Sequence, residues 1–170
     1  MDLDAIRTLL NDLPGPDRAG AEAAAARQAQ LTKPAGSLGR LEDIAVWAAG
    51  WQGRHPPRAE RIQVVVFAAN HGVTARGVSA YPPEVTAQMV ANFAHGGAAI
   101  NQLSRVAGAE LEVHELALDE PTLDFTENAA MSEKDCADAI RLGIDKVDGN
   151  ADLLCIGEMG IGNTTAAAAL

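Results

Sequence analysis

The sequence predicts an α/β fold, in which a Rossmann-like parallel sheet follows a helical N-terminal portion. Three short runs rich in apolar and β-branched residues are candidate strands, at residues 62–68, 111–118 and 153–156. Patterns typical of helices, each about ten residues or longer, separate them. Because parallel strands need crossover connections of this length, the alternation favours a parallel sheet covered by helices. The chain ends at Leu170, soon after a new helix begins, so we expect the sheet to be incomplete in this chain.

Helical patterns also precede the first candidate strand. Apolar residues recur at helical spacing from Leu3 to Leu13, and Pro14-Gly15-Pro16 interrupts the pattern. Asp17 can then cap an alanine-rich helix that extends to about Leu31. The sequence therefore predicts two helices before residue 35.

Two further helices have recognisable ends. Ser37 can cap a third helix, on which the apolar residues between Leu38 and Trp51 share one face. Ser132 can cap another helix that Gly149-Asn150 would end. We expect the first of these helices before the sheet and the second between the last two strands.

Composition restricts the possible partners. With 170 residues, 48% of them apolar, the chain can bury one core. Lys and Arg total 13 against 23 Asp and Glu, a net charge of −10, which argues against binding to nucleic acid or an anionic membrane. No apolar run is long enough to span a bilayer. Cys136 and Cys155 lack the spacing of a zinc site or a disulfide framework, so we expect a cytoplasmic protein.

The clearest candidate site is the glycine-rich segment 157–165, which lies between a predicted strand and a predicted helix. Open α/β sheets bind ligands at this position. Glycines allow close approach of the backbone and amides at a helix start favour anions, so Gly160, Gly162, Asn163 and Thr164 are candidate phosphate ligands. The segment matches neither the Walker pattern nor the complete dinucleotide fingerprint. A tight turn with a capping side chain is an equally good interpretation.

A carboxylate stands within the same segment. Glu158 follows the predicted strand directly, where a negative charge could stabilise developing positive charge or steer a proton. This makes Glu158 the candidate catalytic residue of the chain. The alternative interpretation is a solvated acid of a loop.

A second group of polar residues follows the first predicted strand. His71 can act as acid, base or metal ligand, but no second ligand stands at suitable spacing, so a structural histidine is favoured and no metal site is predicted. Ser79 and Tyr81 provide hydroxyl groups, and Gln88 projects from the first turns of the next helix. These three side chains could line a flat pocket.

Residues 31–42, 70–97 and 157–165 together resemble nicotinate-nucleotide:dimethylbenzimidazole phosphoribosyltransferases, collinearly over nearly the whole chain. The resemblance implies transfer of ribose 5-phosphate from nicotinate mononucleotide to 5,6-dimethylbenzimidazole. The products would be nicotinate and α-ribazole 5′-phosphate, which is used in cobalamin biosynthesis. The resemblance also implies a homodimer that needs no organic cofactor.

The family pattern suggests a role for each candidate residue. Gly160 to Thr164 would hold the phosphate of the mononucleotide, with Glu158 near the ribose. Ser79, Tyr81 and Gln88 would border the benzimidazole pocket. The sequence departs from the pattern at Asn70, where we expect many relatives to carry Asp.

Family members are longer than this chain, and their main catalytic base lies in the part that is absent here. We therefore expect residues 1–35 to be a helical prelude belonging to a small domain, and residues 36–170 to be the N-terminal part of an α/β catalytic domain. Little or no turnover is expected from this chain by itself. A non-catalytic α/β module that binds a nucleotide or phosphate, and an inactive truncated fragment, remain as alternatives.

Overall fold

The computed structural model describes residues 2–170, which form two compact units. We call Arg7–Glu60 the helical unit, and residues 2–6 together with Arg61–Leu170 the α/β unit. Helix α1 (Leu3–Asn11) contributes residues to both. Each unit is described by itself.

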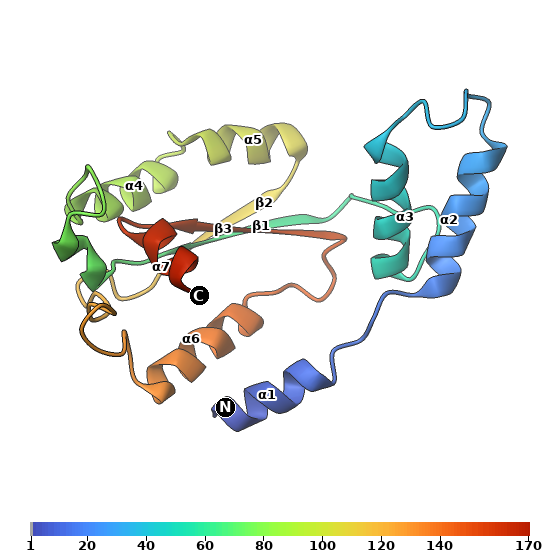
Figure 1. Ribbon diagram of the computed structural model, residues 1–170. Helices are drawn as coiled ribbons and strands as arrows, with labels where there is room; N and C mark the ends of the chain where they lie inside the picture. Colours follow the sequence, from blue (N-terminus) through green and yellow to red (C-terminus); the bar gives the residue numbers. More distant parts are fainter. Residues whose placement is uncertain (1) are drawn as a thin grey trace. The chain divides into compact units, whose positions relative to one another are not determined.

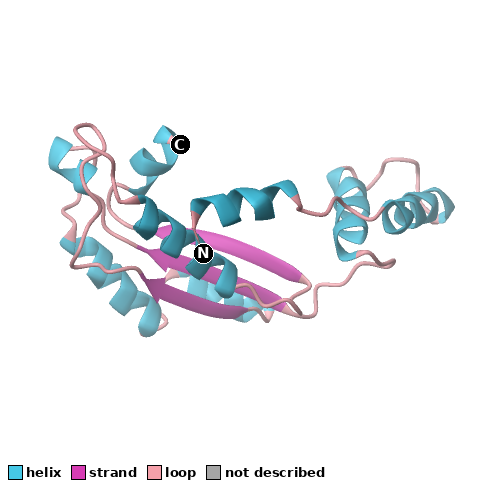
Figure 2. Cartoon of the chain, turned by 90° about the horizontal axis from the view of Figure 1, so that it is seen from below, coloured by secondary structure: helices cyan, strands magenta, loops and turns pink. Residues whose placement is uncertain are grey.

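The α/β unit contains a three-stranded parallel sheet. Its strands are β1 (Ile62–Ala68), β2 (Glu110–Glu115) and β3 (Leu153–Met159), in the order β2-β1-β3. Figure 2 shows them side by side. Val64, Val65 and Val66 in the central strand are buried and form the middle of the core. The predicted α/β fold with a parallel, open sheet is confirmed.

Helices cover both faces of this sheet (Figure 1). After the short 3₁₀ helix η1 (Gly72–Arg76), α4 (Glu84–Ala94) and α5 (Ala99–Ala107) lead from β1 to β2. Helix α6 (Glu133–Asp145) crosses the other face to β3, and α7 (Asn163–Ala169) follows β3. Because the chain leaves β1 in one direction and later returns to its opposite side, β1 and β3 flank the point where the strand order reverses.

Two predicted boundaries need correction. The second strand ends at Glu115 rather than near residue 118, because Ala117 has a φ of 45°, which a strand cannot accommodate. Helix α6 begins after Ser132 as predicted, with the Ser132 hydroxyl accepting a 3.2 Å hydrogen bond from the amide of Asp135. It ends at Asp145, however, and not at Gly149-Asn150, because the Lys146 carbonyl is held by the Gln63 side chain in β1.

The helical unit is built around α2 (Arg18–Gln30) and α3 (Arg40–Gln52), which pack closely together. Small residues make this possible. A Cβ atom on Gly20 would lie 2.6 Å from the carbonyl oxygen of Ala49, and both Ala49 and the neighbouring Gly50 are buried. The large apolar side chains on α3, which the sequence placed on one face, remain exposed: Leu41, Ile44, Trp47 and Trp51.

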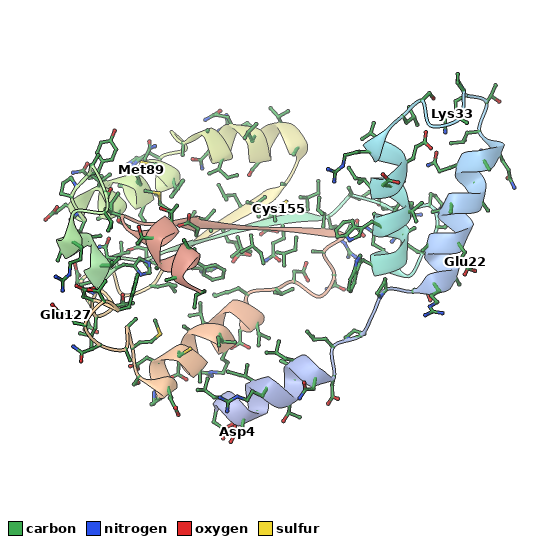
Figure 3. All side chains as sticks on the ribbon, in the orientation of Figure 1. Asp4, Glu22, Lys33, Met89, Glu127 and Cys155 are labelled. Atoms are coloured by element: carbon green, nitrogen blue, oxygen red, sulfur yellow. The ribbon has the colours of Figure 1, made fainter. Side chains whose placement is uncertain are left out.

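The predicted Ser37 cap of α3 is wrong. Helix α3 begins at Arg40, and its cap residue is Gly39, with a φ of 55°. Glu42 holds the preceding loop, accepting hydrogen bonds from the Leu38 amide and from the Lys33 ammonium group at 2.7 Å. Figure 3 labels Lys33 in this loop. The division of the chain after residue 35 stays a prediction, and the compact helical unit extends to Glu60.

We expect Asp17→Ala to lower the free energy of unfolding by about 1 kcal/mol. The Asp17 carboxylate accepts a 2.6 Å hydrogen bond from the amide of Gly20 at the start of α2, and alanine cannot replace this acceptor. Urea denaturation of the helical unit, followed by Trp fluorescence, measures the change. Ser37→Ala is the control and should leave the midpoint unchanged, since Ser37 does not cap α3.

No helix within residues 2–170 is both long and apolar enough to cross a membrane. The thiols of Cys136 and Cys155 are free, and Cys155, which is labelled in Figure 3, is an exposed residue of β3.

Candidate functional site at the carboxyl ends of β1 and β3

The glycine-rich turn after β3 packs directly on the turn after β1. A Cβ atom on Gly160 would lie 2.0 Å from the carbonyl oxygen of Ala69. A Cβ atom on Gly162 would lie 2.9 Å from the Thr74 methyl group and 3.5 Å from the His71 Cβ. Gly162 also has a φ of 91°, which favours glycine. The two groups of residues that the sequence singled out therefore meet where open sheets bind ligands.

Glu158 and Asn163 form a hydrogen-bonded pair within this turn. The side-chain amide of Asn163 donates to the carboxylate of Glu158. Asn163 is only 8% exposed, whereas Glu158 is exposed at the end of β3. Asn163 thus restricts the orientation of the Glu158 carboxylate. Thr164 is exposed at the start of α7, and phosphate binding by Asn163 and Thr164 stays a prediction.

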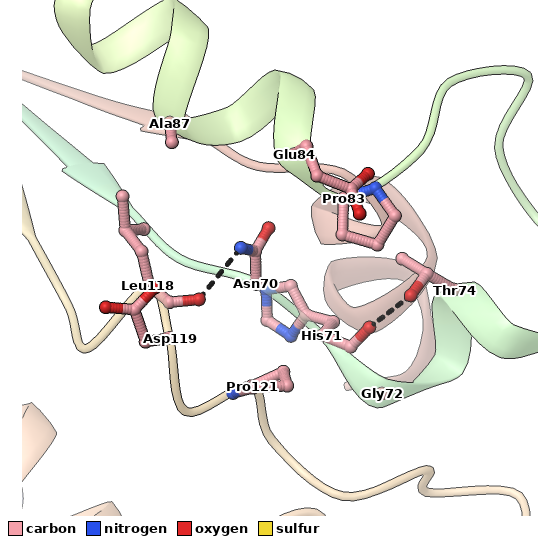
Figure 4. Close-up of a pocket in the computed structure, with 10 residues that line it drawn as sticks. All are labelled: Asn70, His71, Gly72, Thr74, Pro83, Glu84, Ala87, Leu118, Asp119 and Pro121. Atoms are coloured by element: carbon pink, nitrogen blue, oxygen red, sulfur yellow. Dashed lines mark hydrogen bonds between the residues drawn. The ribbon is translucent and has the colours of Figure 1, made fainter.

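Asn70 and His71 line a cavity of about 320 Å³ beside this turn (Figure 4). One side is closed by Pro83, which precedes α4, and by Glu84 and Ala87 of α4. Residues 118–121, which follow β2, contribute the opposite side. The same two residues also line a larger cavity of about 870 Å³, which extends to Glu115 at the end of β2 and to Asp135 on α6.

The amide of Asn70 has a defined structural role. Its Nδ2 donates a 3.0 Å hydrogen bond to the carbonyl oxygen of Leu118, drawn as a dashed line in Figure 4. Its Oδ1 is buried and has no hydrogen-bond partner among the described residues. The side chain therefore fastens the segment after β2 to the end of β1. An aspartate at this position could not make the same bond when ionised.

His71 lies between the segments that surround both cavities. Its backbone pairs with Thr122, and its carbonyl oxygen accepts a 2.8 Å hydrogen bond from the Thr74 hydroxyl. The neighbouring Gly72 amide donates to the Thr122 carbonyl at 2.9 Å. These contacts involve the backbone alone, so the structural role that the sequence favoured for the His71 side chain stays a prediction. Its imidazole still faces the cavities, with Nδ1 3.5 Å from the Thr122 hydroxyl.

Arg76 fastens the loop beyond Thr122 from outside the cavities. Its guanidinium group binds the Asp124 carboxylate at 2.5 Å and also contacts Glu127. Hydrogen bonds from the Thr126 amide and hydroxyl, and then the bond from Arg76, lower the pKa of Asp124 below its ordinary value. Ion pairs and hydrogen bonds therefore hold this loop in place.

A family model described as phosphoribosyltransferase matches residues 13–170. The chain belongs to this phosphoribosyltransferase family. It is 62% identical, over 99% of its length, to a nicotinate-nucleotide–dimethylbenzimidazole phosphoribosyltransferase from Mesorhizobium japonicum, and 60% identical to that of Roseobacter denitrificans. In both comparisons the chain covers 50% of the relative. The chain thus spans about half the length of the curated relatives it matches.

Solved structures from the phosphoribosyltransferase family have the same fold. The crystal structure of the enzyme with this name from Thermus thermophilus matches with a TM-score of 0.79 and 41% identity, over 90% of this chain and 52% of that chain. A structure of CobT from the same organism matches with a TM-score of 0.74 and 42% identity, over 88% and 51% of the two chains. The chain therefore corresponds to the N-terminal half of these phosphoribosyltransferases.

The predicted acceptor-side residues of this phosphoribosyltransferase chain lie on α4 and in the loop before it. Ser79 is half-buried, and its hydroxyl oxygen accepts a 3.2 Å hydrogen bond from the Tyr81 amide. Tyr81 is 66% exposed, and Gln88 is also exposed. The residues that line the two cavities do not include these three. Their predicted role at a benzimidazole pocket stays a prediction.

Sequence reasoning missed Thr86, which is completely buried on α4. Its hydroxyl oxygen accepts a 3.0 Å hydrogen bond from the amide of Ile161 in the glycine-rich turn. The available signal was the position of a threonine on the helix face of Met89, Val90 and Phe93.

For a metal there is no candidate: residues 2–170 contain no group of three or more His, Cys, Asp or Glu side chains that could hold an ion.

We expect Asn70→Asp to lower the free energy of unfolding at pH 7 by about 1–3 kcal/mol. The substitution places a carboxylate against the Leu118 carbonyl and removes the donor between them. Urea denaturation at pH 7 and near pH 4 measures the effect. The loss should be smaller at the lower pH, because a protonated carboxyl group can donate again. An equal loss at both pH values would argue against this hydrogen bond as the cause.

Proposed function

We propose that this chain contributes to a phosphoribosyltransferase that moves ribose 5-phosphate from nicotinate mononucleotide to 5,6-dimethylbenzimidazole. In this reaction the bond between C1′ and the nicotinate nitrogen breaks, and nicotinate leaves with the electron pair. A bond forms between C1′ and the azole nitrogen, and the azole proton passes to a base. The observation that carries the proposal is identity of 60–62% to enzymes with this name along nearly the whole chain.

The glycine-rich turn and Glu158 would act on the nucleotide. Transfer develops positive charge on the ribose, which a nearby carboxylate can stabilise. Glu158 has an exposed carboxylate whose orientation Asn163 restricts, as such a role requires. The turn and the start of α7, where Thr164 is exposed, would hold the phosphate. The proposed phosphate ligands are Gly160, Gly162, Asn163 and Thr164.

The acceptor would bind beside α4. Tyr81 offers an exposed aromatic face, and Gln88 and Ser79 offer polar groups. These side chains fit a flat, weakly polar ring such as a benzimidazole. We further propose that the enzyme acts in the cytoplasm as a homodimer, without a metal or an organic cofactor.

The test is to incubate this chain with nicotinate mononucleotide and dimethylbenzimidazole, and to follow α-ribazole 5′-phosphate by chromatography with mass detection. A protein extended to the length of the curated relatives is assayed in parallel. We expect product from the extended protein and little or none from this chain. Absence of product from both would contradict the proposal and favour a non-catalytic binding module, provided that nicotinate mononucleotide still binds. Absence of both product and binding would favour an inactive fragment.

A further inference from the structure

Thr86 supplies the one buried side-chain hydrogen bond that connects α4 to the glycine-rich turn among residues 2–170. The exposed fraction of Thr86 is 0%. Its hydroxyl oxygen accepts from the amide of Ile161, which is 75 residues away in the sequence. The hydrogen bond is shielded from water at both ends, so no solvent molecule can replace the acceptor without rearrangement.

The glycine-rich turn needs a hydrogen bond from a residue outside the turn to fix its position. Gly160 and Gly162 flank Ile161 and have no side chains of their own to fix the turn. A Cβ atom at either position would come within 3 Å of neighbouring atoms. Residues with side chains that could fix the turn therefore do not fit at these two positions. The Ile161 amide therefore connects the backbone of the turn to α4, in addition to the 3.0 Å hydrogen bond from the Ala69 amide to the Met159 carbonyl just before the turn.

The position of the turn also determines the position of Glu158. Asn163 lies two residues after Ile161, and its side-chain amide donates to the Glu158 carboxylate. Asn163 itself is held by the turn, since its backbone amide donates to the Gly160 carbonyl at 3.2 Å. A shift of Ile161 would thus move Asn163 and change the orientation of the carboxylate.

At the other end of this hydrogen bond, Thr86 belongs to the segment that is proposed to contact the dimethylbenzimidazole. Thr86 lies in the first turn of α4, where its own amide donates to the Pro83 carbonyl at 3.0 Å. Gln88 follows two residues later, and Ser79 and Tyr81 precede the helix. Thr86 therefore joins the segment proposed to border the acceptor to the turn proposed to hold the phosphate.

We propose that Thr86 is a positioning residue, whose hydroxyl group fixes the glycine-rich turn on α4 and so sets the distance between the phosphate side and the acceptor side of the site. The consequence for substrates rests on the proposed function, whereas the consequence for the turn does not. Thr86 touches no reacting atom in this scheme and acts through Ile161.

The matched variants are Thr86→Val, which has nearly the same shape but no acceptor, and Thr86→Ser, which keeps the hydroxyl. Ser104→Ala is the control, because Ser104 is also a buried hydroxyl in a helix and its oxygen has no partner among the described residues. Thr86→Cys, with a weak acceptor of similar size, serves if the valine variant does not fold.

The first measurement uses amide hydrogen exchange of this chain without ligand, resolved by NMR. We expect Thr86→Val to speed exchange at Ile161 by about tenfold or more, with α6 unchanged, and Thr86→Ser to restore the slow rate. The second measurement is the Kd of nicotinate mononucleotide by calorimetry. We expect it to rise about tenfold in Thr86→Val and to stay unchanged in Thr86→Ser and Ser104→Ala.

The two measurements separate the possible failures. Unchanged exchange at Ile161 in Thr86→Val would overturn the positioning role, whatever the substrate is. Faster exchange with an unchanged Kd would also overturn it, because Thr86 would then contribute to local stability alone. If the unsubstituted chain binds no nicotinate mononucleotide, the proposed function fails for this part of the enzyme, and the exchange measurement alone decides the role of Thr86.

Discussion

Gly160→Ala is expected to lower the free energy of unfolding by about 1–3 kcal/mol or more, because the new methyl group has no space. Its carbon would lie 2.0 Å from the Ala69 carbonyl oxygen and 2.2 Å from the Asn163 side-chain oxygen. The first of these atoms belongs to the backbone at the end of β1, so the turn must move away from the strand. Urea denaturation followed by circular dichroism measures the loss.

The same displacement should weaken binding of nicotinate mononucleotide, because Asn163 and Glu158 move with the turn. Gly143→Ala is the control, since a Cβ atom there meets nothing within 4 Å and Gly143 lies inside α6. It should leave binding unchanged and raise stability by up to about 1 kcal/mol, as alanine does in helices. Equal denaturation midpoints for Gly160→Ala and the unsubstituted chain would contradict the contact between the turn and Ala69.

The parallel sheet could be predicted because its signals are local in the sequence. β1 is apolar at every position except Gln63, as expected of a strand buried on both faces, and its observed bounds match the prediction. The Asp17 and Ser132 caps were also found, since a cap depends on residues only three positions apart. Errors arose where a distant contact or a backbone angle decides the end of an element. The Lys146 carbonyl, which accepts from Gln63, is one example.

The candidate site was located from the sequence for a similar reason. Polar residues and glycines directly after buried strands must gather at one edge of a parallel sheet, and the structure places Gly162 of the glycine-rich turn beside His71. The anchor at Thr86 could not be predicted, because its partner Ile161 is 75 residues away and donates a backbone amide. The pairing of Asn163 with Glu158 depends on the shape of the turn, which the sequence does not specify.

Glu158→Gln is expected to reduce kcat by about 100-fold in the protein of full family length, with a much smaller change in KM. Glutamine keeps the size of the side chain, and its carbonyl oxygen can still accept from Asn163. Only the negative charge is lost. That charge is needed most when the ribose becomes positive as nicotinate leaves, so its removal affects the transition state more than the bound substrate.

Glu110→Gln provides the matched control for Glu158→Gln. Glu110 is also an exposed glutamate of the sheet, but it begins β2, at the amino end of the strands and far from the proposed site. Steady-state rates of α-ribazole 5′-phosphate formation should be unchanged by this substitution. A Glu158→Gln enzyme with normal kcat would show that the carboxylate does not stabilise the ribose. Unchanged nucleotide binding by both variants, without turnover by any form of the protein, would instead indicate a binding module in which Glu158 has no chemical role.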